Sequence, residues 1–299
     1  MCLAVLGAGS LAARQAPRQA PLRSSVELVG VTATVRDENG KLVTGLPREA
    51  FQIFEDGAPV PIAQFSNERV PLGLGLLLDI SDSMFGRRIK DAEGAVERFL
   101  TVQLDPADAF FLFAFNHEAR VLFGWKTEFS GVHQALETLK PTGSTAIYDA
   151  MLAAMPYLEN RPRERAAMVL ITDGADTASD ATLHDLRPSL VRTDAFVYAI
   201  AIDTPEPQPI AQRVSVETLN EITGQSGGRT EVVRSTADLD TATANIAEEL
   251  NHQYMLGYAS PHAPDGQYHS IRVRVNNPGY KVRARAGYVA VRRGSGARE

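Results

Sequence analysis

The sequence predicts an α/β protein in which a doubly wound, mostly parallel sheet with helices on both faces is inserted into a small β-sandwich-like domain. The first observation is an alternation between residues 71 and 250, where short apolar runs are followed by stretches whose apolar residues recur every three to four positions. This is the pattern of strands alternating with helices. The second observation is that both flanking segments have apolar residues at every other position, which is typical of antiparallel strands with one buried face.

The block 71–250 begins with a strand that we expect to be buried on both faces. Residues 72–80 read LGLGLLLDI, a nearly continuous apolar run of the kind found in parallel sheets. After it the apolar period changes to that of a helix, and the two patterns then alternate to the end of the block. Further strands are expected at 109–115, 167–172, 195–202 and 229–233, and helices at 87–104, 130–139, 146–159, 182–192, 215–223 and 236–250.

The flanking β domain is expected to consist of residues 24–70 and 251–292. In the first half, the sequences DENG at 37–40 and Asp56-Gly57 predict turns, because Asn, Asp and Gly tolerate positive φ. The second half shows strand patterns at 254–259, 268–275 and 281–291. About three strands with a covered face are needed for a stable sheet, so we expect the two halves to pair with each other. Residues 293–299 are interpreted as a tail.

Residues 1–23 are interpreted as a secretory signal segment and a linker. The run MCLAVLGAGSLAA is short and apolar, and Ser10-Leu11-Ala12 fits the small-x-small pattern of a signal-peptidase site. No basic residue precedes the run, so the signal is atypical, and an apolar N-terminal segment without that role is the alternative. The only cysteine is Cys2, which excludes an internal disulfide and a zinc site built on cysteines. We expect a periplasmic, secreted or cell-surface protein.

Composition excludes several classes of protein. Hydrophobic residues make up 44% of the chain and charged residues 22%, values that exclude a disordered or polytopic membrane protein. Past the N-terminal segment, no run approaches the ~18 apolar residues of a membrane span. The formal charge is −6, so we expect no nucleic-acid partner.

Polar residues that could hold a metal ion follow the first strand of the α/β block. Asp79, Ser81 and Ser83 are alternate residues leaving an extended strand, so their side chains can point into one crevice at the carboxyl edge of the sheet. Gly143-Ser144-Thr145 and Ile171-Thr172-Asp173 fall at equivalent edges and offer a hydroxyl and a carboxylate. Carboxylate and hydroxyl oxygens suit Mg²⁺ better than Zn²⁺, which favours nitrogen and sulfur.

These three segments, DxSxS, GST and TDG, resemble the metal-ion-dependent adhesion site of von Willebrand factor A-type domains. The resemblance covers about residues 70–250 and implies Asp79, Ser81, Ser83 and Thr145 around the metal, with Asp173 binding it directly or one group removed. Many relatives have Gly-Gly-Thr where this chain has Gly143-Ser144-Thr145, a difference that leaves the hydroxyl intact. The flanks, with VTGLPREAFQIFEDGAPVPIAQF before the block and QYMLGYAS and VRARAGYVA after it, are similar to bacterial exported proteins described as having a VWFA-related domain.

Other residues near these segments are expected to have structural roles. Asp82, Asp149 and Asp176 are interpreted as helix-start or turn residues. The sequence GQSGG at 224–228 matches G-x-S-x-G but follows a helix, so it is interpreted as a helix C-cap rather than a nucleophile elbow. The six histidines show no H-E-x-x-H or similar metal spacing, and His117-Glu118 is interpreted as a hairpin turn. No P-loop sequence occurs.

A basic pattern occupies the C-terminal strands. In the segments 271–275 and 282–286, arginines alternate with apolar residues, so the arginines share one face of each strand. We interpret them as a solvated outer face, and contact with an acidic polymer or an anionic membrane as the alternative. The residues are Arg272, Arg274, Arg283 and Arg285.

The function that this sequence favours is that of a non-enzymatic, exported binding protein. Mg²⁺ prefers six oxygen ligands and the site supplies four or five, so an Asp or Glu carboxylate of a protein partner can complete the coordination; Mn²⁺ or Ca²⁺ would serve in the same way. One rival is a metal-dependent hydrolase that uses the ion to activate water. Another is an intracellular scaffold subunit that works beside an ATPase. The sequence does not set the oligomeric state.

Overall fold

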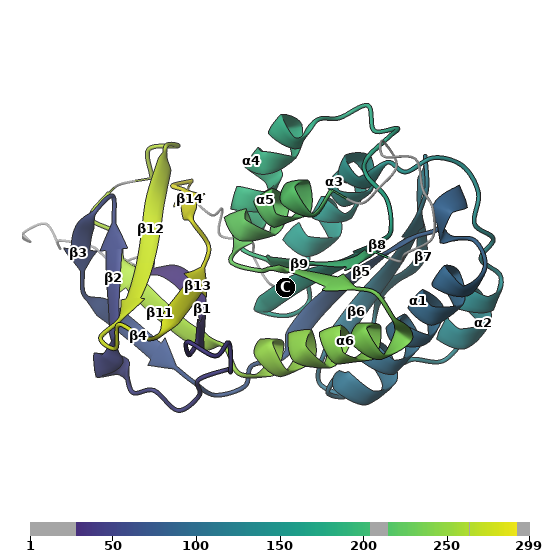
Figure 1. The fold of residues 1–299 in the computed structure, drawn as a ribbon. Coiled ribbons are helices and arrows are strands. Elements are labelled where there is room, and N and C mark those ends of the chain that lie inside the picture. Colours follow the sequence, from purple (N-terminus) through teal and green to yellow (C-terminus); the bar gives the residue numbers. More distant parts are fainter. Residues whose placement is uncertain (1–27, 204–214, 263, 292–299) are drawn as a thin grey trace, which may run out of the picture.

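The computed structural model describes residues 28–203, 215–262 and 264–291, which form two lobes joined side by side (Figure 1). One lobe, the α/β lobe, contains a six-stranded sheet with helices, and the other, the β lobe, contains two four-stranded sheets. The signal segment expected at 1–23 and the tail at 293–299 lie outside the described residues. No helix among the described residues has the length and apolar character needed to cross a membrane.

The sheet of the α/β lobe has the strand order β10-β9-β8-β5-β6-β7. All neighbours pair in parallel except β6 and β7, which form an antiparallel hairpin at one edge. The hairpin turn contains His117 and Glu118, as the sequence predicts. The strands are β5 (Leu72–Asp79), β6 (Ala109–Phe115), β7 (Ala119–Lys126), β8 (Arg165–Thr172), β9 (Phe196–Ile202) and β10 (Thr230–Val233).

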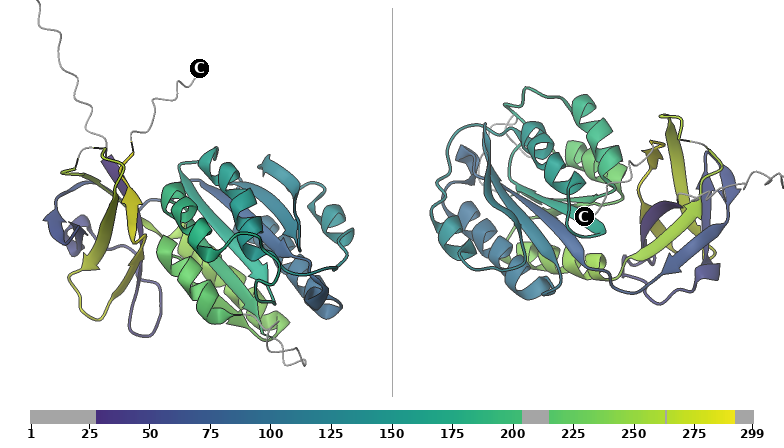
Figure 2. Two further views of the ribbon diagram at one scale, coloured as in Figure 1. Left: turned by 90° about the horizontal axis from the view of Figure 1, so that it is seen from above. Right: turned by 180° about the vertical axis from the view of Figure 1, so that it is seen from behind.

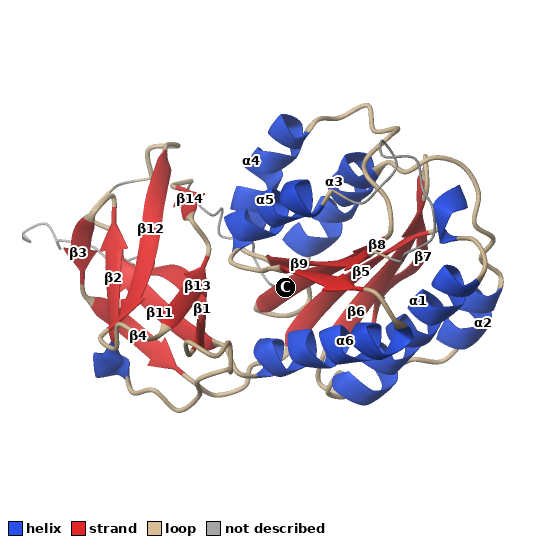
Figure 3. Cartoon of the chain, in the orientation of Figure 1, coloured by secondary structure: helices blue, strands red, loops and turns tan. Residues whose placement is uncertain are grey.

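Helices cover both faces of this sheet, which confirms the doubly wound fold (Figure 3). One face packs against α1 (Arg87–Arg98), α2 (Val132–Glu137) and α6 (Thr236–Asn251), and the other against α3 (Ile147–Glu159), α4 (Leu183–Thr193) and α5 (Val216–Ser226). The glycines of β5 make room for aromatic rings on the second face. A Cβ atom at Gly75 would lie 2.3 Å from Cζ of Phe111, so this ring can pack directly on the strand backbone.

The β lobe is a sandwich in which each sheet mixes strands from both ends of the chain, as Figure 2 shows. The sheet orders are β13-β1-β11-β4 and β14-β12-β2-β3. Apolar residues of both flanks form one core, in which the rings of Phe51 and Tyr254 lie 4.7 Å apart. The strands are β1 (Leu28–Arg36), β2 (Phe51–Glu55), β3 (Ala58–Val60), β4 (Ile62–Ser66), β11 (Tyr254–Ala259), β12 (Tyr268–Val275), β13 (Lys281–Ala284) and β14 (Gly287–Val289).

Three elements in the α/β lobe and the C-terminal flank differ from the sequence prediction. One is β7, a strand that follows the His117-Glu118 turn and is not among the expected strands. The strand expected at 281–291 is broken after Ala284, and its two pieces, β13 and β14, belong to different sheets. Arg285, which follows the break, forms an ion pair with Asp194 of the α/β lobe. The helix expected at 87–104 ends at Arg98, and residues Phe99–Gln103 form a π-helical turn.

A buried carboxylate joins the two lobes. Glu249, in the last turn of α6, is 0% exposed and accepts a hydrogen bond from the Tyr198 hydroxyl at 2.8 Å. Arg36 of β1 lies 2.8 Å from it and Arg229 lies 3.1 Å from it, and Arg283 of β13 forms a third ion pair. Glu249 therefore links α6, through charged hydrogen bonds, to both of the chain segments that form the β lobe.

Candidate metal centre

The polar residues singled out by the sequence lie at the carboxyl edge of the central strands. In the sheet, β5 lies between β6 and β8. The chain passes from β5 to β6 and β7 on one side and then continues with β8, β9 and β10 on the other side, so the strand order reverses at β5. Such a switch point leaves a crevice at the carboxyl ends of the strands, where open α/β sheets bind ligands. Asp79 is the last residue of β5, and Asp173 follows β8.

Hydrogen bonds join four of the five candidate ligands. The backbone N–H of Ser81 donates to Oδ1 of Asp79 at 2.8 Å, which curls the chain back over the end of β5. The hydroxyl oxygens of Ser81 and Ser83 lie 3.0 Å apart, and Ser83 donates to Oδ1 of Asp173 at 2.6 Å. The 3-10 turn Asp82–Met84 holds this loop in place. The structure therefore brings Asp79, Ser81, Ser83 and Asp173 into one group of oxygens.

The loop that carries Thr145 is held against the same group by backbone hydrogen bonds. The N–H of Asp82 donates to the carbonyl of Gly143 at 2.8 Å, and that of Thr142 donates to the carbonyl of Ile80 at 2.9 Å. Gly143 has φ +80°, and a Cβ atom there would lie 2.5 Å from Nδ1 of His117. A side chain at this position would therefore push the Thr145 loop away from the strand ends.

Asp79 is a fully buried carboxylate without a cation beside it. The residue is 0% exposed, and its Oδ2 accepts a hydrogen bond from the Thr172 hydroxyl at 2.6 Å. Burial raises the pKa of Asp79 to about 7, although the hydrogen bonds from Thr172 and Ser81 oppose the shift. Across the described ranges, no lysine or arginine forms an ion pair with Asp79.

Asp173, in contrast, has a cationic neighbour. Nη1 of Arg88, on α1, lies 3.1 Å from Oδ2 of Asp173 and donates to the carbonyl of Ser83 at 2.6 Å. Arg88 itself is only 8% exposed. Arg88 is a site residue that the motif does not contain, although its place as the second residue of the helix after DxSxS is a signal for it.

The nearby acids have the structural roles expected of them. Asp149 accepts the backbone N–H groups of Asp180 and Ala181 at 2.8 and 3.0 Å. Asp176 accepts the N–H of Tyr148 and the hydroxyl of Ser179. These two side chains hold the loop after Asp173 against the start of α3. Asp82 is exposed and begins the 3-10 turn, and Gly227 caps α5 in the left-handed conformation.

The four C-terminal arginines do not form one surface. Arg272 and Arg274 are exposed on β12, whereas Arg283 and Arg285 belong to the segment that faces the α/β lobe. There Arg283 pairs with Glu249 and Arg285 pairs with Asp194. Period-two alternation shows which residues share a face of a strand but not what that face meets, and for this pair the interpretation as a solvated face is wrong.

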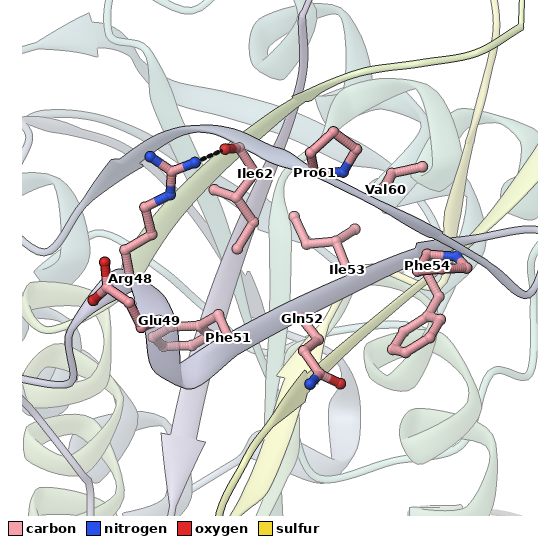
Figure 4. Close-up of a pocket in the computed structure, with 10 residues that line it drawn as sticks. Arg48, Glu49, Phe51, Gln52, Ile53, Phe54, Val60, Pro61 and Ile62 are labelled. Carbon is pink, nitrogen blue, oxygen red and sulfur yellow. Dashed lines mark hydrogen bonds between the residues drawn. The ribbon is translucent and has the colours of Figure 1, made fainter.

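The β lobe holds two further features that sequence reasoning missed. One is a hollow of about 480 Å³ between β2 and the β3–β4 segment, drawn in Figure 4. Its charged lining residues are Arg48 and Glu49, and Arg48 donates to the carbonyl of Ile62 rather than pointing into open space. The other is a cluster of Glu55, His262 and His269. The spacing H-x-x-D-x-x-x-H at 262–269 is the signal that could have found the histidines.

Comparison with known proteins identifies the same domain family that the sequence resembles. Residues 74–175 match the family model of the von Willebrand factor type A domain. The chain is 24% identical over 185 residues to inter-alpha-trypsin inhibitor heavy chain H2 of Sus scrofa, a match that covers 58% of this chain and 19% of that protein. The chain thus spans about a fifth of this curated relative.

Solved structures show the same fold. A von Willebrand factor type A protein from Catenulispora acidiphila superimposes with a TM-score of 0.54 at 13% identity, over 90% of this chain and 75% of that one. The likeness therefore extends over both lobes. Proximal thread matrix protein 1 from the mussel byssus, described with a zinc-occupied MIDAS motif, has a TM-score of 0.51 at 18% identity, over 66% of this chain and 49% of that one.

Proposed function

We propose that this protein, which carries a von Willebrand factor type A domain, is an exported, non-enzymatic binding protein that captures a partner through a divalent cation. The residues that would hold the ion are Asp79, Ser81, Ser83, Thr145 and Asp173. The observation that carries the proposal is the burial of Asp79 with hydrogen-bond donors but no cation. An isolated buried charge is strongly destabilising unless it is paired or binds a metal.

The donor set fits a hard cation. Carboxylate and hydroxyl oxygens are the ligands that Mg²⁺, Mn²⁺ and Ca²⁺ take in proteins, and Mg²⁺ usually retains several waters. The hydroxyl of Ser83 already lies between Ser81 and Asp173, so the oxygens need little rearrangement. Mg²⁺ is the ion that we propose. The zinc-occupied MIDAS motif of the mussel protein supports metal binding at the corresponding edge of this fold.

The charge balance favours capture of a carboxylate. Asp79 and Asp173 contribute two negative charges, and Arg88 beside Asp173 contributes one positive charge. With Mg²⁺ bound, the group would carry a net charge of about +1 by this count, which attracts an Asp or Glu side chain of a protein partner. The serine and threonine ligands add no charge, so the ion stays electrophilic. This is the chemistry of an adhesion contact and needs no catalytic base.

The hydrolase alternative depends on a base beside the ion. His117 packs on Gly143 in the loop that carries Thr145, but it is exposed on a hairpin turn. No described histidine forms a hydrogen bond with Asp79, Ser81 or Asp173. We therefore favour binding over hydrolysis. A variant His117→Gln should leave partner capture unchanged, whereas a hydrolase that used this base would lose turnover.

The experiment is an affinity capture from the envelope and extracellular fractions of the source organism, using the full chain as bait. A true partner should be retained in Mg²⁺, released by a chelator and absent with Asp79→Ala. Asp82→Asn is the matched control, because Asp82 lies between the ligands in sequence but is exposed. Ser81→Asp should keep the metal and weaken capture, since it adds negative charge where the partner carboxylate would bind. Capture that survives both the chelator and Asp79→Ala would contradict the proposal.

A further inference from the structure

A second group of metal-ligating side chains lies in the β lobe. Glu55 ends β2, His269 is on β12, and His262 is in the connection between β11 and β12. One donor atom from each of these three residues lies within 4.8 Å of the others. The group belongs to the sandwich of β strands, whereas the oxygens of the candidate metal centre belong to the α/β lobe.

The two imidazole rings are held by carboxylates. Nδ1 of His269 lies 2.7 Å from Oδ2 of Asp56, and Nε2 lies 3.3 Å from Oδ1 of Asp265. The ring of His262 stacks on that of His269 with centroids 4.2 Å apart, and its Nε2 lies 3.5 Å from Asp56. Asp56 is itself fixed by the backbone N–H and the hydroxyl of Ser270. A carboxylate on one ring nitrogen, here Asp56 on Nδ1 of His269, is the arrangement that orients a metal-binding imidazole. Nε2 is then the nitrogen that would bind the metal, and it would give up its longer contact with Asp265 to do so.

The surroundings of Glu55 are a second observation that favours a cation at this group. Its carboxylate is 1% exposed and accepts hydrogen bonds from the hydroxyls of Ser260 and Tyr288. Within the described ranges it forms no ion pair with a lysine or arginine. The hydroxyl of Tyr258 is buried beside it, and burial together with the Glu55 charge raises the pKa of Tyr258. A buried acid that has hydroxyl donors but no lysine or arginine beside it favours the binding of a cation.

We propose that Glu55, His262 and His269 form a second cation site, selective for Zn²⁺ or a similar transition-metal ion, with Asp56 as the positioning residue for His269. Two imidazoles and one carboxylate are a donor set that Zn²⁺ takes, with water or a further ligand in the fourth position. Mg²⁺ and Ca²⁺ prefer oxygen ligands alone. The two sites of this chain therefore call for ions of different classes.

The role of this site is that of a clip across the inserted domain. Glu55 belongs to the first flank and both histidines to the second, with the whole α/β lobe between them in sequence. Cross-links that close long loops have the largest entropic effect on the unfolded chain. Tetrahedral Zn²⁺ needs donor atoms about 3.4 Å apart, so Zn²⁺ binding requires the His262 ring to leave its stacked position on His269 and turn toward Glu55. The His262 side chain is 41% exposed, which leaves room for this rotation.

The test is a titration of Zn²⁺ into the full chain carrying Asp79→Asn, so that the candidate metal centre does not take part. We expect one Zn²⁺ per chain and a rise in melting temperature. His262→Gln should abolish both while leaving the circular dichroism and the melting temperature in chelator unchanged, because His262 is at the surface. Asp56→Asn should weaken Zn²⁺ binding about 10- to 100-fold. Co²⁺ in place of Zn²⁺ should give the absorption bands of tetrahedral nitrogen and oxygen coordination.

His184→Gln is the matched control, because His184 is an exposed histidine on α4, and it should bind Zn²⁺ as the parent does. The competing interpretation is that His269 is a structural imidazolium clamped between Asp56 and Asp265. It predicts no Zn²⁺ binding in the Asp79→Asn chain, and a loss of stability with His269→Gln in chelator. That result, or unchanged Zn²⁺ binding in His262→Gln, would overturn the proposal. Neither outcome affects the Mg²⁺ test at Asp79, so the two proposals fail separately.

Discussion

Two buried acids of this protein, Glu249 and Asp79, have opposite surroundings. Both are 0% exposed. Glu249 lies among three guanidinium groups and a tyrosine hydroxyl, and although burial raises its pKa, the charges of Arg283 and Arg229 bring the pKa below its ordinary value of 4.5. Asp79 has only hydroxyl and amide donors, and burial raises its pKa to about 7. Glu249 therefore has positively charged partners within the fold, whereas Asp79 has hydrogen-bond donors alone.

This difference separates a structural acid, Glu249, from Asp79, the acid to which we assign a functional role in our proposal. A buried acid that already has cationic side chains beside it needs no further ion, and its removal leaves uncompensated positive charge. A buried acid without a cation retains an affinity for one from solution. Glu249 is placed where it joins the two lobes, whereas Asp79 is placed at the strand switch point, where ligands bind.

The largest expected effect on stability comes from neutralising Glu249, the buried acid that has cationic partners. Glu249→Gln should lower the free energy of unfolding by about 3 to 5 kcal/mol, because breaking a buried ion pair from one side leaves the other side desolvated and unpaired. Asp79→Asn in chelator should change it by less than about 1 kcal/mol, since no ion pair is lost. Chemical denaturation of both variants measures the contrast. A larger loss of unfolding free energy in Asp79→Asn than in Glu249→Gln would contradict this comparison of the two acids.

The next largest effect is expected from the binding of Mg²⁺ at Asp79. Mg²⁺ at 100 times its dissociation constant should stabilise the wild type by about 2.7 kcal/mol if it binds only the folded chain. The melting temperature should rise accordingly, and Asp79→Ala should remove the rise. Glu249→Gln should keep it, because Glu249 ends α6 beside the β lobe, whereas Asp79 lies at the carboxyl end of β5. An equal rise in Asp79→Ala would place the ion elsewhere.

Acid should weaken the Glu249 contact. The pKa of Glu249 is lowered in the folded state, so its stabilising effect is present above its ordinary value of 4.5 and is lost as the pH falls below it. Between neutral pH and about pH 3, the wild type should lose more unfolding free energy than Glu249→Gln does. Denaturant titrations of both chains across this range isolate the contribution of Glu249. Parallel curves would show that its charge does not hold the lobes together.

The smallest effect is expected at Arg88. Arg88→Met removes the positive charge beside Asp173, so Mg²⁺ should bind severalfold more tightly, by about 1 kcal/mol, and carboxylate capture should weaken. Arg88→Lys keeps the charge and is the matched control. Titration of Mg²⁺ into the wild type, Arg88→Met and Arg88→Lys gives the order of their affinities for Mg²⁺. Weaker Mg²⁺ binding in Arg88→Met, with wild-type binding in Arg88→Lys, would show that the charge of Arg88 supports the ion rather than opposing it.

The fold of the α/β lobe could be predicted because its signals are local. The apolar run at 72–80 and the helical periods after it fix strand and helix identities within short windows, and DxSxS places its side chains by the same local geometry. The lobe contacts could not be predicted in this way. Arg283 and Arg285 look like exposed strand positions, and only the packing of β13 against the α/β lobe shows that they meet Glu249 and Asp194.

The histidine cluster escaped the sequence analysis for a related reason. Glu55 is separated from His262 and His269 by the inserted lobe, so no short motif contains all three ligands. Arg88 differs, because it lies in the helix that follows the motif, but its contact with Asp173 depends on the parallel pairing of β5 and β8. Charges that meet only through the tertiary fold leave no periodic pattern in the sequence.

We propose that a divalent ion supplies the positive charge that Asp79 lacks. The most direct measurement is a Mn²⁺ titration followed by the electron paramagnetic resonance signal of the free ion, with competition by Mg²⁺. His262→Gln should be present in every chain, so that the β-lobe cluster does not contribute. We expect one Mn²⁺ per chain that Mg²⁺ displaces, and no such site once Asp79→Asn is added. Equal Mn²⁺ binding with and without Asp79→Asn, or no Mn²⁺ binding in either chain, would contradict the account.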